Sequence, residues 1–594
     1  MRRRGGHPTP PVTLCTFYDS TSGQWLTFRN PIRTVVANTL SEVRPSLDLI
    51  EALVDNRQLH AAGFIGYEAA PAFDSSLTVR PDPSGFPLLW FGLFEEPERR
   101  AELPPPSNHP PRRPTRWTSS INHDQYREAM ARLHTYLYSG DTYQVNYSFR
   151  LQAPFTDEPW SFFCDLVRSQ NARHAAFMEN DRFALCSASP EQFFLLNGDH
   201  ITSRPMKGTA RRGRTPEEDR SCAEALRHSP KDRAENVMIV DMIRNDLGRI
   251  ATPGSVHPSA LFTLERYPTA WQMTSTVSAH TRASVHDILT ALFPCASITG
   301  APKPRTMAII SELETTPRRI YTGSIGFIAP HRQAQFNVAI RTVLIDKSSG
   351  TAEYGVGGGI VWDSTSQAEY EECQTKARIL TDQRPEFQLL ETLLWTPEAG
   401  VFLLDRHLQR LSESADYFDY HVSEPDIRAA LQSWADTRPN GPHRLRLLAT
   451  RDGVITLQEQ PVQAASDEPV RIKLAPTPID PSNLFLYHKT TFRTIYEQAR
   501  SACKDCEDVL LWNPGAELTE STIANLVVDL DGELITPPIA CGLLPGTFRA
   551  ALLAEGKIRE KIVRVADLPK CRHLWLINSV RKWRAAMLII PPAV

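Results

Sequence analysis

The chain has 594 residues, which is too long for one ordinary hydrophobic core and predicts two or more domains. Its composition, 41% hydrophobic and 22% charged, is that of a globular protein, and a net charge of −3 disfavours a nucleic-acid binder. We expect no membrane segment, because no apolar run approaches the ~20 residues of a membrane helix. The basic start at 1–10 is not followed by the apolar stretch of a secretory signal, and ten scattered cysteines suit a reduced, cytoplasmic location.

Two proline-marked breaks divide the sequence. The stretch 101–117 contains six prolines, and we interpret it as a long surface loop rather than an interdomain linker. The stretch 381–387 follows a helical run that Pro385 prevents from continuing. We therefore expect a first domain over 1–380, a linker at 381–387 and a second domain over 388–594. Both domains mix strands and helices, which predicts the α+β class.

In the first domain, two charged residues stand out. Lys207 lies in SRPMKGTARRG, where we expect a turn, and taken alone it would be an exposed lysine. Glu235 opens ENVMIVDMIRNDLGRI (235–250), whose apolar residues recur at helical spacing. The carboxylate falls on that buried stripe, so it either caps the helix N-terminus or pairs with a cation.

Two further segments favour an anion. Arg341 stands in FNVAIRTV, which reads as an apolar strand, and a buried arginine needs an anion, whether internal or bound. YGVGGGI (354–360) has four glycines in seven residues, which lets backbone N–H groups approach an anion closely. It matches no nucleotide-binding motif.

The stretch STSQAEYEECQTKARIL (364–380) is predicted to be a helix that opens with a Ser364/Gln367 capping box. One face of this helix carries Glu369, Glu372 and Lys376. That face is either an exposed ion-paired surface or a second metal carboxylate with an adjacent cation. Carboxylates from two separate helices suit Mg²⁺. Taken together, the segments predict a pocket for a small polyanion.

Residues from about 10 to 380 closely resemble the chorismate-utilising enzymes of the aminodeoxychorismate synthase component I type. The matching stretches are GFIGYEAAPAF (63–73), GDTYQVNYSFRL (140–151), SASPEQFF (187–194), RPMKGTARRG (204–213), ENVMIVDMIRNDLGRI (235–250), SITGAPKPRTM (297–307), YTGSIGF (321–327), FNVAIRTV (336–343) and YGVGGGIVWDSTSQAEYEEC (354–373).

The resemblance implies a fold and a site. The fold is a two-sheet β-sandwich with helices. Mg²⁺ would be held by Glu235 and Glu372. The substrate chorismate would be bound by Arg341, Lys376, Gly357, Gly358, Gly359 and Thr299.

The resemblance also implies a reaction. Lys207 occupies the position where anthranilate synthases carry alanine, and it would attack C2 of chorismate as the 4-hydroxyl leaves, before ammonia adds at C4. Glu191 matches the general acid/base. Gln144 stands where isochorismate-forming relatives use a lysine to activate water, which argues against water as the nucleophile. Gln272 replaces a histidine of many relatives. The chain has no G-x-C-x-G-x-Q motif, so ammonia would come from solution or from a separate glutamine amidotransferase.

In the second domain we expect a hairpin over 443–459 with an Asp452-Gly453 turn, and strands over 509–535 with an Asp531-Gly532 turn. Arg410 and Lys489, taken alone, are ordinary surface residues. Glu520 precedes a strand, and Gly546-Thr547 opens a helix suited to a phosphate.

This half resembles the fold-type IV pyridoxal-phosphate family, which includes aminodeoxychorismate lyase and aminotransferases, through LLDRHLQRLSESA, HKTTFR, LTESTIANLVV and LLPGTFR. The resemblance implies a Schiff-base lysine at Lys489 and a pyridine-nitrogen partner at Glu520. The phosphate would be held by Arg410, Gly546 and Thr547. The strand and turn that usually precede the L-L-E-T stretch of the family are absent, and Cys503-x-x-Cys506 is interpreted as inert.

The fusion indicates a bifunctional enzyme that makes 4-amino-4-deoxychorismate and then releases pyruvate to leave 4-aminobenzoate. Three alternatives stay open: a synthase whose second half is a transaminase or an inactive remnant, an anthranilate synthase, and a non-catalytic module that binds chorismate or a partner. Fold-type IV relatives are commonly dimers, so we expect a homodimer through the second domain.

Overall fold

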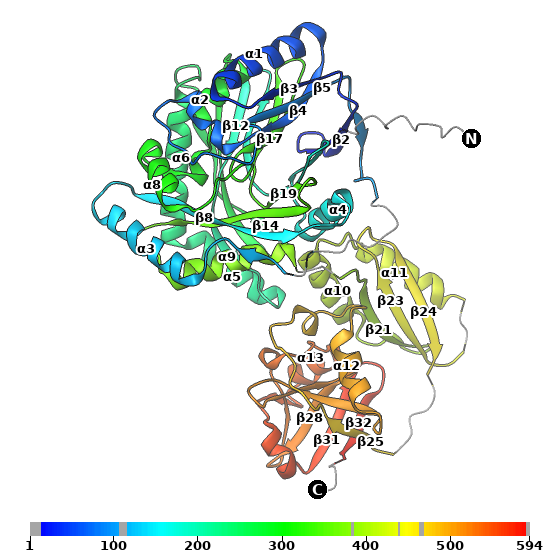
Figure 1. Ribbon diagram of the computed structural model, residues 1–594. Coiled ribbons are helices and arrows are strands. Elements are labelled where there is room, and N and C mark those ends of the chain that lie inside the picture. Colours follow the sequence, from blue (N-terminus) through cyan, green and yellow to red (C-terminus); the bar gives the residue numbers. More distant parts are fainter. Residues whose placement is uncertain are drawn as a thin grey trace, which may run out of the picture. The chain divides into compact units, whose positions relative to one another are not determined.

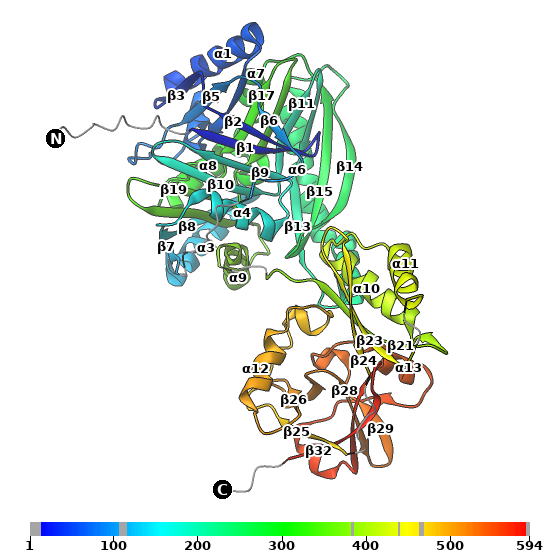
Figure 2. The same ribbon diagram turned by 90° about the vertical axis from the view of Figure 1, so that its right-hand side faces the viewer.

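The computed structural model describes residues 13–105, 114, 116–381, 385–437, 440–462 and 468–589. The basic start at 1–10 lies outside the described residues, as do parts of the proline-rich stretch and of the expected linker. The chain divides into two compact units (Figures 1 and 2). The first unit comprises Met1–Arg211 and Ala223–Arg384, and the second comprises Arg212–Cys222 and Pro385–Val594.

The first unit is built on two antiparallel sheets. In spatial order, one sheet consists of β16 (Gly300–Ala301), β8 (Gln144–Pro154), β20 (Thr351–Ile360), β19 (Thr342–Asp346), β10 (Phe183–Ser189), β9 (His174–Glu179), β1 (Leu14–Asp19), β2 (Gln24–Arg29) and β6 (Glu98–Arg100), with β7 (Thr118–Ser119) also on β8. The other consists of β13 (Met206–Arg211), β15 (Ala270–His280), β12 (His200–Arg204), β11 (Gln192–Asn197), β18 (Gln333–Val338), β17 (Ser324–Ala329), β4 (His60–Ile65), β5 (Leu89–Phe94) and β3 (Arg33–Ala37), with β14 (His257–Arg266) also on β15.

An apolar core joins the inner faces of these sheets. Phe17 of β1 and Phe327 of β17 meet edge to face, with ring centroids 5.7 Å apart. Leu185 of β10 and Phe64 of β4 belong to the same buried cluster. The two sheets therefore pack face to face as the expected sandwich, and the fold class expected from the sequence is confirmed.

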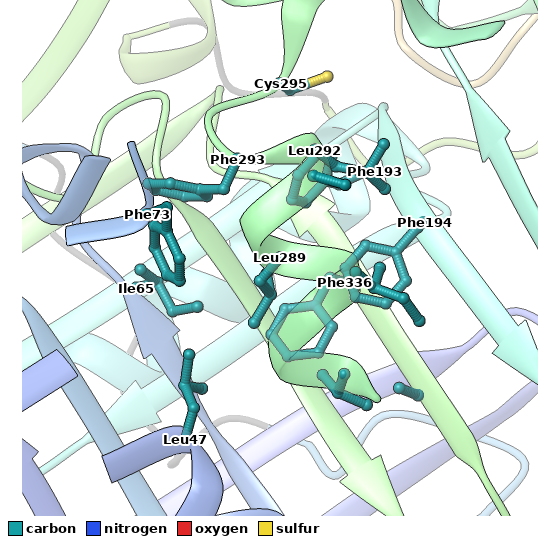
Figure 3. Close-up of a cluster of buried hydrophobic side chains, with 14 of the residues drawn as sticks. Leu47, Ile65, Phe73, Phe193, Phe194, Leu289, Leu292, Phe293, Cys295 and Phe336 are labelled. Atoms are coloured by element: carbon teal, nitrogen blue, oxygen red, sulfur yellow. The ribbon is translucent and has the colours of Figure 1, made fainter. Parts of the chain in front are cut away.

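Helices cover both outer faces of the sandwich. The second sheet is covered by α1 (Leu40–Arg57), α2 (Ala70–Phe73), α6 (Pro230–Gly248) and α7 (Val285–Leu292), and the first by α3 (His123–Tyr138), α4 (Pro159–Gln170), α8 (Lys303–Leu313) and α9 (Ser366–Ala377). Figure 3 shows Leu289 of α7 beside Phe336 of β18. Leu289 is fully buried, so truncating it to alanine would cost about 2–5 kcal/mol.

The second unit contains a small sheet and a barrel. The small sheet runs β22 (Gly400–Val401), β21 (Leu389–Thr396), β23 (His443–Ala449), β24 (Ile455–Pro461), and α10 (Leu404–Phe418) and α11 (Glu424–Ala435) pack on it. The barrel runs β27 (Leu518–Ser521), β26 (Asp508–Trp512), β25 (Val470–Leu474), β32 (Lys582–Leu588), β31 (His573–Asn578), β28 (Asn525–Leu530), β29 (Glu533–Thr536), β30 (Arg559–Glu560). A Glu520–Asn525 pairing joins β27 to β28 and closes the barrel.

The remaining helices are α5 (Pro216–His228), α12 (Thr494–Ala502) and α13 (Thr547–Ala554). The hairpin turn at Asp452-Gly453 and the turn at Asp531-Gly532 are confirmed, and Gly453, Asp531 and Gly532 all have positive φ. None of the helices in the described part of the chain is long and apolar enough to cross a membrane.

Two local expectations for the first domain are wrong. Lys207 lies on strand β13, not in a turn, and a register shift between Met206 and Thr209 interrupts the pairing of this strand with β15. Such a bulge redirects the side chains it contains. Arg341 lies between β18 and β19 rather than within a strand, with a φ of 49°.

Two expected helix starts are also wrong. Helix α6 begins at Pro230, so Glu235 is in its second turn and cannot cap it. The N-cap of α9 is Thr365, whose hydroxyl accepts from Ala368 N. The Ser364 hydroxyl is occupied elsewhere, because it donates to Glu369 Oε1 at 2.7 Å.

Candidate active sites

A cavity of about 350 Å³ opens in the first unit where the strands of both sheets meet helices α6 and α9. Strand β13 contributes Lys207, β20 contributes the glycine run, α6 contributes Glu235 and α9 contributes Glu372 and Lys376. The structure therefore brings together segments that are up to 230 residues apart in the sequence, from Asn146 to Lys376.

Lys207 is the nucleophile candidate of this cavity. Burial lowers the pKa of its amine, and the Lys376 ammonium lowers it further, while Glu235 and Glu191 oppose this shift. The net effect is a lowered pKa, which increases the fraction of neutral amine at neutral pH. A neutral amine is the form that can attack carbon.

Glu191 borders the same cavity and is buried. Burial raises the pKa of its carboxyl to about 7, although Ser297 and Lys207 favour the charged form. The Ser297 hydroxyl donates to Glu191 Oε1 at 2.5 Å and fixes the orientation of the carboxyl. A carboxyl that titrates near neutral pH can both give and take a proton in the cavity.

Three carboxylates line the cavity: Glu235 from α6, and Glu369 and Glu372 from α9. Burial raises the pKa of Glu235, and the neighbouring Asp232 and Glu369 carboxylates also raise it. Lys376 lies 2.8 Å from Glu372 Oε1 and holds the pKa of that carboxyl below its usual range. Such mutually repelling carboxylates favour a bound cation.

The residues present fit Mg²⁺ rather than a metal that needs a full protein cage. Among the described residues, no group of three or more His, Cys, Asp or Glu side chains is arranged to hold a metal ion. Mg²⁺ uses one or two carboxylates and completes its shell with water and substrate oxygens. The Glu372 side chain is 47% exposed, so it is open to such a shell.

Other residues that line this cavity suit an anion. Lys376 Nζ donates to Gly357 O at 2.9 Å, and its pKa is raised because Glu372 outweighs burial. Arg341 donates to Gln170 Oε1 at 2.9 Å and has no carboxylate partner among the described residues. The glycines at 357–359 lie on β20, and Gly358 packs so closely on the Glu369 carboxylate that a Cβ there would stand 2.9 Å from Oε2.

One expected substrate residue does not reach this cavity. Thr299 is fully buried, and its hydroxyl lies 3.3 Å from the carbonyl oxygens of Cys295 and Ala296. Gln272 does line the cavity, and it accepts from the Thr209 hydroxyl at 3.0 Å. Gln144 is buried behind Gly359, and its Oε1 has no hydrogen-bond partner among the described residues.

A second cavity, of about 680 Å³, lies in the second unit and contains the other expected site residues. They are Arg410, Lys489, Glu520, Gly546 and Thr547. Burial lowers the pKa of Lys489 to about 8, and the Arg410 guanidinium adds to this effect. The lowered pKa makes Lys489 a competent amine at neutral pH.

Glu391 holds Arg410, a lining residue of this second cavity, in place. Its carboxylate accepts from Arg410 Nε at 2.8 Å and from His407 Nδ1 at 2.7 Å. Because a carboxylate only accepts, the shared proton is on Nδ1, and Nε2 of the imidazole is left to accept from the Thr547 hydroxyl at 3.2 Å. Arg410 also donates to Pro545 O. The network fixes Arg410 and Thr547 at the N-terminus of α13.

Glu520 also lines the second cavity. Burial raises the pKa of its carboxyl to about 7. The Tyr496 hydroxyl donates to Oε1 at 2.8 Å, Leu544 N donates to the same oxygen at 3.1 Å, and Asn525 Nδ2 donates to Oε2 at 3.1 Å. A bound cationic pyridine nitrogen would favour the charged carboxylate.

These residues fit pyridoxal phosphate. The cofactor has an aldehyde, a ring nitrogen and a phosphate. The cavity offers an amine (Lys489) for the aldehyde, a buried carboxyl (Glu520) for the ring nitrogen, and a helix N-terminus (Gly546-Thr547) for the phosphate. The Gly546 backbone lies so close to Asn525 that a Cβ at this position would stand 1.9 Å from Asn525 Oδ1.

Sequence reasoning did not assign several residues of this cavity. Glu391 and Asn525 lie in stretches that match the family but have no role assigned by the resemblance, and Tyr496 lies outside those stretches. A carboxylate in an otherwise apolar strand, such as Glu391 in LLETLLW, is the signal that could have indicated the first of these.

Comparison with known proteins identifies a family for each of the two parts of the chain. Residues 14–382, more than half of the chain, match the family model for chorismate binding enzyme. The chain belongs to the chorismate binding enzyme family. Residues 388–589 match the model for amino-transferase class IV, which confirms the fold-type IV expectation for the second domain.

Named relatives of this chorismate binding enzyme include two synthases. It is 43% identical over 278 residues to aminodeoxychorismate synthase component 1 of Salmonella typhimurium, an alignment covering 46% of the chain and 61% of that protein. It is 39% identical over 267 residues to an anthranilate synthase component 1 of Haloarcula marismortui, covering 44% of the chain and 54% of that protein. The chain thus spans about three-fifths of the length of the first curated relatives it matches.

A solved structure shows the same fold. Anthranilate synthase component I from Streptococcus pneumoniae superposes with a TM-score of 0.54 at 23% identity, covering 64% of the chain and 94% of that protein. This likeness supports the sandwich architecture of the first unit.

Proposed function

We propose that this chain is a bifunctional enzyme of 4-aminobenzoate synthesis. The first domain (1–380) converts chorismate and ammonia to 4-amino-4-deoxychorismate and water, and the second (388–594), after a linker at 381–387, splits that product into 4-aminobenzoate and pyruvate. The observation that carries the proposal is Lys207, an amine of lowered pKa in a cavity that also presents Arg341, Lys376 and acidic metal candidates.

In the first reaction, Lys207 Nζ bonds to C2 of chorismate as the C4–O bond breaks, and Glu191 supplies the proton with which the hydroxyl leaves as water. Ammonia then bonds to C4 as the C2–Nζ bond breaks, and a proton of the added nitrogen returns to Glu191. Arg341, Lys376 and the glycines at 357–359 hold the substrate carboxylates. Mg²⁺, held by Glu235 and Glu372, would supply positive charge beside a carboxylate.

In the second reaction, Lys489 holds and moves the proton at the carbon that bears the substrate amine. Arg410 and the Gly546-Thr547 turn bind the cofactor phosphate, and Glu520 holds the pyridine nitrogen. Pyridoxal phosphate, when bound, supplies an electron sink. Loss of the enolpyruvyl group as pyruvate leaves an aromatic ring, which makes the step strongly favourable.

The proposal also covers the source of the ammonia and the oligomeric state of the chain. A separate glutamine amidotransferase would supply the ammonia, which accords with the name "component 1" of several relatives. A homodimer through the second domain and a cytoplasmic location stay predictions.

A mass-spectrometric assay tests the proposal. The purified chain is incubated with chorismate, ammonium, Mg²⁺ and pyridoxal phosphate, and we expect 4-aminobenzoate and pyruvate in equal amounts. Lys207→Ala should abolish both, and near-wild-type turnover in that variant would contradict the covalent role. Accumulation of 4-amino-4-deoxychorismate would indicate a synthase with an inactive second half, and anthranilate would indicate the alternative that the Haloarcula relative represents.

A further inference from the structure

The cavity of the second unit carries more positive charge than its cofactor residues require. Two of its lining arginines, Arg446 and Arg584, are half-buried, and neither guanidinium has a hydrogen bond or ion pair with any residue in the described part of the chain. Two other arginines of this unit are paired with carboxylates: Arg410 with Glu391, and Arg549 with Glu560. A guanidinium that lines a cavity and has no carboxylate partner is available to bind an anionic ligand, so both side chains favour a bound anion.

The two arginines come from different sheets. Arg446 lies on β23 between Leu445 and Leu447, which are buried in the core beneath the small sheet, so the alternation of the strand turns Arg446 to the cavity. Arg584 lies on β32 of the barrel, opposite Leu576. Neither strand carries a residue of the proposed cofactor site. The pair is therefore a separate feature of the same cavity.

No carboxylate among the described lining residues is available to neutralise Arg446 and Arg584. Glu520 is the only carboxylate among the described lining residues, and it already accepts from Tyr496, Leu544 N and Asn525. The cofactor phosphate would be taken by Arg410 and the Gly546-Thr547 turn. An amino-acid substrate with one carboxylate would neutralise one arginine and leave the other without an anion.

We propose that Arg446 and Arg584 form a subsite for a dianionic amine, with each guanidinium binding one carboxylate of the substrate. This inference rests on the proposed function and deepens it, because 4-amino-4-deoxychorismate carries two carboxylates, one on the ring and one on the enolpyruvyl group, in addition to its amine. The subsite would select this substrate class and disfavour amino acids that carry a single carboxylate.

Steady-state kinetics of the full chain tests the subsite. Arg446→Gln and Arg584→Gln should each raise the KM for 4-amino-4-deoxychorismate about 10-fold or more, the usual loss for one hydrogen-bonded charge pair, with kcat little changed. Pyruvate release is followed with lactate dehydrogenase. Arg446→Lys keeps the positive charge but loses the planar guanidinium, so its KM should lie between those of the wild type and of Arg446→Gln. Arg559→Gln, at an exposed arginine outside the cavity, is the matched control and should leave KM unchanged.

A binding measurement separates this inference from the proposed function. Isophthalate, a benzene dicarboxylate, and benzoate are titrated calorimetrically into the full chain. We expect isophthalate to bind more tightly than benzoate and to lose about 10-fold in affinity in either glutamine variant. Equal affinities for the two probes, or unchanged isophthalate binding and KM in both variants, would overturn the subsite. If the wild-type chain releases no pyruvate but binds isophthalate in this arginine-dependent way, the lyase activity fails and the subsite stands.

Discussion

Gly359 borders the Lys207 amine so closely that a Cβ at this position would stand 2.6 Å from Lys207 Nζ. The same Cβ would stand 2.3 Å from Gln144 Nε2, so the amine and the amide lie next to each other against one glycine. Both close atoms are ends of flexible side chains, and the φ of Gly359 is not in the left-handed region. The glycine therefore serves the position of the amine more than the folding of the strand.

Gly359→Ala should separate activity from stability. We expect the free energy of unfolding to change by no more than about 1 kcal/mol, because the neighbouring side chains can move aside. Formation of 4-amino-4-deoxychorismate should fall by about 100-fold, the usual cost of misplacing a reacting group by about 1 Å. Gly248→Ala is the control, since a Cβ there meets no atom within 4 Å, and it should keep full activity. Wild-type turnover in Gly359→Ala would show that Lys207 is not positioned through this glycine.

As the proposed acid of the first reaction, Glu191 should make that reaction sensitive to pH near neutrality. Its pKa is raised to about 7 by burial, and as the acid for the leaving hydroxyl it must be protonated. The rate of 4-amino-4-deoxychorismate formation should therefore decline as the pH rises through about 7. Glu191→Gln should lower the rate by about 100-fold or more, a typical general-acid effect, and the decline of the rate above about pH 7 should disappear. An unchanged decline in the variant would assign the titration to another group.

The sequence predicted which residues line the cavities better than it predicted their local surroundings. The helical stripe after Glu235 and the glycine run were visible because both depend on local spacing. Lys207 was expected in a turn because nothing in SRPMKGTARRG indicates the register shift against β15 that places it on a strand. Thr299 was assigned by resemblance, and its burial behind the cavity depends on tertiary packing.

The second cavity shows the same limit. Arg410, Lys489 and Glu520 were predicted from motifs. The Glu391 carboxylate that fixes Arg410 is 19 residues away from it, and the two meet only because α10 packs on β21. Arg446 and Arg584 face one cavity only because the small sheet and the barrel both border it. Such pairings are set by the fold and leave no periodic signal in the sequence.

Removal of the metal should stop one reaction and spare the other. EDTA is expected to abolish 4-amino-4-deoxychorismate formation and to leave pyruvate release from added 4-amino-4-deoxychorismate unchanged, because the proposed metal ligands Glu235 and Glu372 line the first cavity and not the second. Glu372→Gln should raise the Mg²⁺ concentration for half-maximal rate by 10-fold or more, the usual effect of weakening one coordinating group. Glu371→Gln, a carboxylate of the same helix that does not line this cavity, is the control. Full synthase activity after exhaustive chelation would contradict the metal assignment.

Glu391 should contribute strongly to the stability of the second domain. Burial works to raise its pKa, but Arg410 and His407 outweigh this and hold the pKa at about 2. Because this value lies below that of an unfolded carboxyl, the contribution is present above about pH 4.5 and is lost as the pH falls toward 2. Glu391→Gln should cost about 3–5 kcal/mol in urea unfolding at pH 7, since it leaves Arg410 without its carboxylate. Glu424→Gln, in an exposed ion pair with Arg428, should cost less than about 1 kcal/mol. Equal effects of the two substitutions would show that the buried pair contributes no more than an exposed one.

The assignment of Lys489 has a direct chemical test. Its lowered pKa, about 8, keeps a usable fraction of neutral amine at pH 7–8, which is the form that condenses with an aldehyde. The purified chain with pyridoxal phosphate should show an absorbance band that borohydride bleaches, and peptide mapping should find the reduced cofactor on Lys489. Lys489→Ala should show no such fixation and release no pyruvate, while it keeps the Mg²⁺-dependent first reaction because Lys207 is in the other cavity. Lys557→Ala, at a lysine outside both cavities, should retain the band. A wild-type chain that neither takes up pyridoxal phosphate nor releases pyruvate would mean that this half no longer acts as a lyase, and the function would then reduce to the synthase alone.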